Sequence, residues 1–78
     1  MKILLLLTML FGALFAKVNI NTATMDELHS LKGIGHTKAT AIIEYRKEHK
    51  FEKKEDIVKV KGIGEKLFEK IEDDIEVK

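Results

Sequence analysis

A short phrase occurs twice in this chain, and the repeat constrains the fold more than any other feature of the sequence. Residues 31–42 read LKGIGHTKATAI and residues 60–71 read VKGIGEKLFEKI. Both glycines of the first phrase have a counterpart 29 residues later in the second. Each half is too small to bury its own apolar residues, so the two copies must pack on each other. We therefore predict one small domain built from two units of helix, tight turn and helix.

The other local signals are those of helices, and no segment alternates long enough to predict a strand. Thr24 and Glu27 form a Thr-x-x-Glu capping box, which predicts a short helix from about Met25 that stops at Gly33. A longer helix is expected over residues 36–48. Two more are expected in the second half, a short one with Ile57 and Val60 and a last one with Leu67, Phe68, Ile71 and Ile75. The predicted fold is all-α.

The apolar residues of both units are expected to form one shared core. A chain of about 60 residues buries only about 60% of its unfolded surface, so few of its apolar residues can lie outside the core. The predicted core comprises Leu28, Leu31, Ile34, Ala39, Ile42, Ile43, Phe51, Ile57, Val60, Ile63, Leu67, Phe68 and Ile71.

The beginning of the chain differs from the rest, because residues 3–16 form an uncharged and largely apolar run. A membrane span needs about 20 apolar residues, whereas a signal peptide has a basic start, a short apolar stretch and a small residue before the cut. We predict a signal peptide helix over residues 1–16, cleaved after Ala16, and one domain over residues 17–78. An uncleaved anchor stays open, because Leu14 is larger than is usual at its place before the cut.

Charge is balanced after the predicted leader but unevenly distributed. From Lys32 to Lys61 nine basic residues stand against five acidic ones, a local charge of +4, whereas residues 72–76 include four acids. A basic half beside an acidic end can orient a polyanion on one face of a domain. A solvated surface without a partner is the alternative.

Each Gly-Ile-Gly turn has the parts of a phosphate site. The first glycine can end a helix with positive φ, the isoleucine can point inward, and the second glycine leaves the amides of the next helix bare. Free amides at the positive end of a helix dipole bind anions such as phosphate. The predicted site residues are Gly33, Gly35, His36, Thr37 and Lys38 with Lys32 before them, and Gly62, Gly64 and Lys66 with Lys61 before them.

Alternatives to a phosphate site remain at this stage. Gly-Ile-Gly can simply make a tight corner between helices, since glycine is common at helix ends. Glu65 also disfavours a phosphate at the second turn unless its side chain turns away. A helical adaptor that binds other proteins is the alternative function, because fold does not fix function.

The sequence predicts no enzyme. No Ser/His/Asp set, nucleotide-binding loop or pair of buried carboxylates is recognised, and two hairpins leave no room for a base pocket. The three histidines have no cysteine beside them and no i, i+4 partner among themselves, so no zinc site is predicted. A single tyrosine and no tryptophan argue against a stacking platform for single strands.

These residues resemble a known family. The two phrases are similar to the halves of a double helix-hairpin-helix domain, and NINTATMDEL, IIEYR and GIGEK resemble the ComEA family, the exported DNA receptors of bacterial natural transformation. The resemblance covers residues 18–77. It implies two helix-hairpin-helix units packed as a pseudo-twofold domain. It also implies turns that grip the backbone of DNA through amides and lysines, without reading sequence.

The resemblance further implies what the chain binds and where it acts. The partner would be double-stranded DNA, with inner-membrane DNA-uptake machinery as a candidate second partner and no small-molecule substrate. The location would be periplasmic or otherwise extracytoplasmic after cleavage, or membrane-tethered without it. No cofactor is expected, apart from a monovalent cation that the backbone carbonyls of Gly33 and Gly62 could hold. The family usually has proline where this chain has Lys32 and His36, so the first turn is less rigid but more basic.

Overall fold

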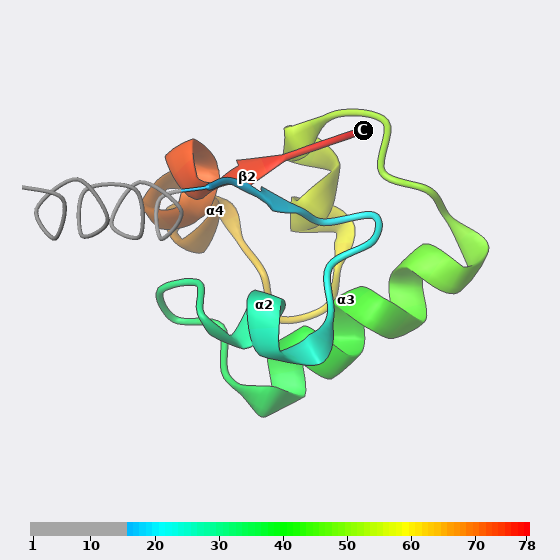
Figure 1. Ribbon diagram of the computed structural model, residues 1–78, viewed down its shortest axis with the longest axis horizontal. Helices are drawn as coiled ribbons and strands as arrows, with labels where there is room; N and C mark the ends of the chain where they lie inside the picture. Colours follow the sequence, from blue (N-terminus) through cyan, green and yellow to red (C-terminus); the bar gives the residue numbers. More distant parts are fainter. Residues whose placement is uncertain (1–15) are drawn as a thin grey trace, which may run out of the picture.

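The computed structural model describes residues 16–78, which form a mostly helical domain with a small sheet on one side (Figure 1). The elements in order are β1 (Val18–Asn19), α2 (Met25–His29), α3 (His36–Glu48), the 3-10 helix η1 (Lys54–Lys59), α4 (Glu65–Ile71), the 3-10 helix η2 (Glu72–Asp74) and β2 (Ile75–Glu76). Within these residues, no helix is both long enough and apolar enough to cross a membrane. The signal peptide predicted over residues 1–16 lies almost wholly outside the described residues, so it stays a prediction, as does the domain boundary after it.

The all-α prediction is wrong where the two ends of the domain meet. β1 and β2 pair in parallel, with Val18 opposite Ile75 and Asn19 opposite Glu76. The backbone N–H of Ile20 extends this pairing by donating to the carbonyl of Glu76 at 3.1 Å. Strands of two residues are too short to show the alternation by which a strand is recognised in a sequence. The sheet is therefore missing from the prediction, whereas the longest predicted helix, over residues 36–48, matches α3.

The last helix is shorter than predicted, and Ile75 lies in β2 instead. α4 ends at Ile71, and η2 follows it with three consecutive acidic residues. Carboxylates at the negative end of a helix dipole disfavour its continuation. The ammonium of Lys54 in η1 donates to the carbonyl of Glu72 at 3.0 Å, which satisfies one of the carbonyls that a helix end leaves free.

One apolar core lies between the helices and the sheet. Eleven of the thirteen predicted core residues are buried, whereas Ile43 and Leu67 are half-buried and pack against its edge. The prediction misses Ile20, Ala23 and Ile75, which are also buried. These three lie in the irregular segment after β1 and in β2, where no helical spacing marks a core position. The core thus draws on both units, as the repeat requires.

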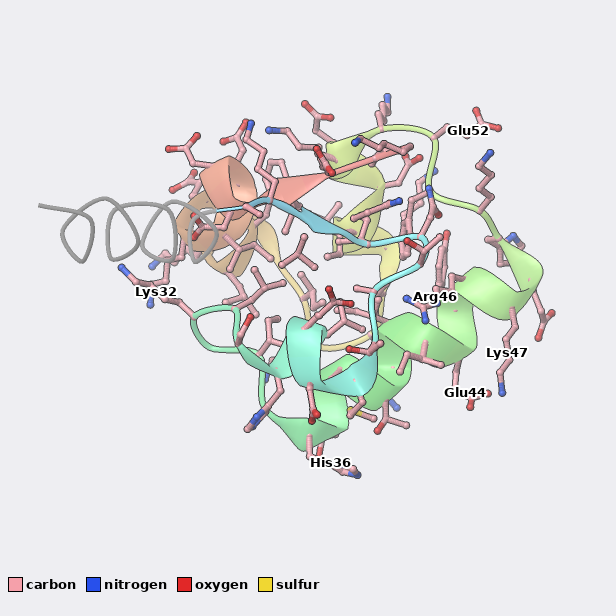
Figure 2. The ribbon with its side chains drawn as sticks, viewed as in Figure 1. Lys32, His36, Glu44, Arg46, Lys47 and Glu52 are labelled. Carbon is pink, nitrogen blue, oxygen red and sulfur yellow. The ribbon has the colours of Figure 1, made fainter. Side chains whose placement is uncertain are left out.

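Polar side chains tie the segment after β1 to the rest of the fold. The side-chain amide of Asn21 donates to the carbonyl of Phe51 and accepts from the N–H of Phe51, both at 2.9 Å. It also donates to the carbonyl of Lys78 at 3.3 Å. The guanidinium of Arg46 points from α3 toward this segment and donates to the carbonyl of Ile20 at 3.1 Å (Figure 2). The phrases NINTAT and IIEYR therefore contain residues that serve the fold.

Each unit begins with a carboxylate that caps a short helix. At α2 the hydroxyl of Thr24 accepts from the N–H of Glu27 at 3.2 Å, and the Glu27 carboxylate accepts from the N–H of Thr24 at 2.8 Å. This confirms the predicted capping box. At η1 the counterpart of Glu27 is Asp56, which accepts from the N–H groups of Glu52 at 2.9 Å and Lys53 at 3.2 Å.

The carboxyl group of Asp56 is buried and acts as an acid-sensitive support of η1. The hydrogen bond from Glu52, helped by the one from Lys53 and by the Lys59 ammonium at 3.4 Å, lowers the pKa of Asp56 below its ordinary value of 3.8, although burial opposes the shift. Because the pKa is lower in the folded state, ionised Asp56 stabilises the fold above the ordinary pKa, and this contribution is lost as the pH falls through the folded-state value.

Candidate nucleic-acid interface

The first glycine of each phrase has the backbone conformation that the sequence predicts. Gly33 has φ of +76° and Gly62 has φ of +93°, and no other residue among 16–78 has positive φ. A residue with a Cβ atom is strained in this region. In each turn the N–H of the isoleucine donates to the carbonyl three residues earlier, at 3.1 Å for Ile34 and 3.0 Å for Ile63. Both isoleucines are buried, so the same tight corner is made twice.

The second glycine of each phrase precedes a helix, and nothing inside the fold requires it to be glycine. Gly35 and Gly64 have φ of −89° and −106°, in an extended conformation that any residue adopts. A Cβ atom built on either glycine would meet no atom within 4 Å. The missing side chains therefore leave open surface, which allows an external group to approach the backbone closely.

The helices after these glycines begin without a side-chain cap. A serine or aspartate at this position would accept hydrogen bonds from the first amides of the helix, as Thr24 does for α2. Gly35 and Gly64 cannot, and neither α3 nor α4 has a side-chain hydrogen bond at its start. Because the first amides of a helix have no partner within it, those of α3 and α4 are left for an outside acceptor.

The predicted polar residues lie around these starts but differ in exposure. Lys32, Lys61 and Lys66 are exposed, and so are His36 and Thr37. In Figure 2, Lys32 and His36 both point away from the body of the domain. The turns also differ in charge, since the first turn of α4 contains an exposed acid at position 65 and that of α3 contains none.

Each turn lies against the helix that follows the other turn. A Cβ atom on Gly62 would be 3.8 Å from both Cγ and Cε of Lys38, which belongs to α3. A Cβ atom on Gly33 would be 2.8 Å from Cδ1 of Leu67, which belongs to α4 and stands 29 residues after Lys38. The structure thus brings the two predicted sites together. It also shows that a residue other than glycine at position 33 would be strained by its φ, and that its Cβ atom would require the end of the Leu67 side chain to shift.

Two further features of residues 16–78 lie apart from the Gly-Ile-Gly turns. Among residues 16–78, no group of three or more His, Asp or Glu side chains could hold a metal ion. An open hollow lies at the end of α3 toward η1, and none of the predicted site residues lines it. Tyr45 lines this hollow and stacks on Phe51, with ring centroids 5.2 Å apart, while its ring is tilted against that of His49 at 5.1 Å.

The repeated turns and their uncapped helices define the class of protein. Residues 15–76 match the family model described as helix-hairpin-helix motif, and the chain belongs to this family. It is similar to ComE operon protein 1 of Bacillus subtilis (strain 168), with 57% identity over 68 residues. The match covers 86% of this chain and 33% of the Bacillus protein. The resemblance to the ComEA family that the sequence predicts is therefore confirmed.

Other relatives share the same region. An uncharacterized protein of Haemophilus influenzae is 49% identical over 61 residues, which are 76% of this chain and 54% of that protein. The endonuclease/exonuclease/phosphatase family domain-containing protein 1 of Rattus norvegicus is 41% identical over 56 residues, which are 70% of this chain but only 10% of the rat protein. The chain spans about a third, a half and a tenth of the lengths of these three relatives.

Proposed function

We propose that this chain binds double-stranded DNA through the phosphate backbone, without reading base sequence. The observation that carries the proposal is the pair of Gly-Ile-Gly turns, each with a second glycine that opens an uncapped helix start to solvent. Phosphate contacts position a protein on a duplex, whereas sequence is read by groups placed against base edges. Backbone amides and flexible lysine side chains are donors that contact phosphates and do not read base edges. Membership of the helix-hairpin-helix family supports this function.

Each turn would hold one phosphate or two. At the first turn, the amides after Gly35 would donate to phosphate oxygens, with the exposed side chains of Lys32, His36 and Thr37 around them. At the second turn, Lys61 and Lys66 would take this part. Glu65 is exposed, so its side chain is free to turn into solvent, away from the phosphate.

We also infer that the two hairpins are related by a pseudo-twofold axis. The approach of Lys38 to Gly62 and of Leu67 to Gly33 supports this, because counterparts in the two units make reciprocal contacts. Such contacts are the mark of a twofold arrangement. Two sites related in this way suit a duplex, whose two strands are themselves related by local twofold axes.

The site of action is proposed to be outside the cytoplasm. The apolar run over residues 3–16 supports export, and the similarity to ComE operon protein 1 supports a role in DNA uptake during transformation, with inner-membrane machinery as the next partner. We expect the chain recovered from the envelope to begin at Lys17, which its intact mass would show. A mass that includes residues 1–16 would indicate a membrane-tethered receptor, and recovery from the cytoplasm would contradict export.

The proposed function needs no catalysis. The enzymatic name of the rat relative belongs to a protein of which this chain matches one tenth. The monovalent cation predicted at the carbonyls of Gly33 and Gly62 remains a prediction; both residues are exposed, and backbone oxygens are suitable ligands for a hard cation. A helical adaptor is the alternative function, and a protein that binds no DNA would favour it.

A titration of unrelated duplexes at several salt concentrations tests the proposed function. If each turn contacts one or two phosphates, log K should fall with log salt at a slope of roughly −2 to −4, from about −0.9 per phosphate. Duplexes of different sequence should bind within about 2-fold of each other, because no donor reads base edges. Affinity that does not respond to salt, or strong preference for one sequence, would contradict the proposal.

A further inference from the structure

Lys38 differs from the other three lysines of the predicted sites. Lys32, Lys61 and Lys66 are exposed, whereas Lys38 is half-buried. Its stem lies beside Gly62, at ordinary van der Waals distance from the position that a Cβ atom would occupy there. A stem held by packing loses less rotamer freedom when its ammonium meets a ligand.

The turn that Lys38 approaches is not its own. Lys38 follows the first Gly-Ile-Gly turn in the chain, yet its Cε lies 3.8 Å from the place of a Cβ on Gly62, in the second turn. The ammonium is one further bond away, about 1.5 Å. In the other direction Leu67 covers Gly33, and Leu67 carries no charge. Of the two side chains that reach across to the other turn, the one over the second turn is therefore a lysine and the one over the first turn is uncharged.

An additional positive charge would favour phosphate binding at the second turn in particular. The first turn of α4 contains an acid at position 65, and the first turn of α3 contains none. An acid near free amides at a helix start weakens their attraction for a phosphate. A lysine from the neighbouring helix would offset this effect.

We propose that Lys38, although it belongs to the first hairpin, contacts the DNA phosphate held by the second turn. The two turns then form one coupled site. This inference rests on the proposed function, since it assigns a residue within the DNA-binding surface. From its place in the sequence alone, Lys38 would be assigned to the first turn.

A double-mutant cycle on the chain recovered from the envelope in mild detergent tests the assignment. Lys38→Met keeps an apolar stem over Gly62 and removes the charge. Gly35→Asp and Gly64→Asp each block one turn with a carboxylate at its helix start, where an added Cβ atom would meet no atom within 4 Å. Binding of a labelled duplex is followed by fluorescence anisotropy at low salt, and the melting temperature of each variant reports its folding.

Lys38→Met alone should weaken binding about 10-fold and reduce the salt slope by about 1, as expected for one phosphate contact. The loss should remain about 10-fold with Gly35→Asp but fall within about 2-fold with Gly64→Asp, because residues that share a ligand are not additive. Lys47→Met is the matched control; Lys47 is exposed on α3 and paired with Glu44 at 3.1 Å. It should change affinity by less than about 2-fold.

Equal losses in both glycine backgrounds would overturn the inference, because Lys38 would then act independently of the second turn. A loss that persists with Gly64→Asp and disappears with Gly35→Asp would also overturn it, by assigning Lys38 to its own turn. Neither result would affect the proposed function. Failure of the unaltered chain to bind any duplex would overturn the proposed function, and this inference with it.

Discussion

Replacing Gly35 and Gly64 together by aspartate is expected to abolish measurable binding to duplex DNA without destabilising the domain. Each aspartate would accept hydrogen bonds from the first amides of its helix and add a negative charge where a bound phosphate is proposed to lie. Loss of two charge-assisted contacts, at about 1.5 to 3 kcal/mol each, lowers affinity at least 100-fold. The same caps stabilise α3 and α4 by a few tenths of a kcal/mol each relative to glycine, so the melting temperature should stay the same or rise slightly.

Because DNA affinity should fall while the melting temperature stays the same or rises, a loss of binding can be distinguished from a loss of folding. A Cβ atom at either position would meet no atom within 4 Å and the φ is one that any residue adopts, so the aspartate variant should fold, which the melting temperature checks. Asparagine at both positions is the matched control, because it caps the helices without the added charge and should weaken binding less. Full affinity in the aspartate variant would mean that the turns are only structural corners. The adaptor function would then be the better explanation of the fold.

Ile34→Ala and Ile63→Ala should each destabilise the domain severely. Both side chains are nearly inaccessible, at 2% and 3% exposure, and pin the two turns into the shared core. A large-to-small change at such a site costs about 2 to 5 kcal/mol. At about 4 to 8 °C per kcal/mol for a domain of this size, the melting temperature should fall by roughly 8 to 40 °C. Thermal unfolding followed by circular dichroism measures this directly.

Binding should follow folding in these variants. At a temperature low enough to keep them folded, their affinity for duplex DNA should lie near that of the unaltered chain, because the isoleucines face inward. Ile43→Ala is the control, since Ile43 is half-buried at the edge of the same core and should cost much less stability. An unchanged melting temperature combined with a loss of affinity would show that Ile34 or Ile63 contacts the ligand instead of the core.

Much of the fold follows from the 29-residue repeat, because both copies place the same residue types under the same physical demands. The positive φ at Gly33 and Gly62 and the burial of Ile34 and Ile63 were all predictable from one turn motif used twice. The bare helix starts were predictable too, since a glycine before a helix supplies no cap. Local chemistry therefore accounts for the backbone of the two turns and for the bare helix starts that follow them.

Contacts between distant parts of the chain account for what the sequence did not reveal. Asn21 and Arg46 bind backbone groups of Phe51 and Ile20, which are 30 and 26 residues away from them. The pairing of β1 with β2 joins the two ends of the domain and involves only two residues on each side. The direction of Lys38 depends in the same way on how the two units pack. No periodicity or cap marks such contacts, because they depend on the assembled fold.

Amide chemical-shift mapping tests most directly whether the two turns together form a DNA-binding surface. The ¹⁵N-labelled chain would be titrated with a short duplex of arbitrary sequence. The largest shifts should fall on the amides of residues 35–38 and 64–67, while the hollow around Tyr45 and His49 should change little. Shifts concentrated at that hollow, at only one of the two turns, or nowhere in the domain would contradict a duplex held by both Gly-Ile-Gly turns.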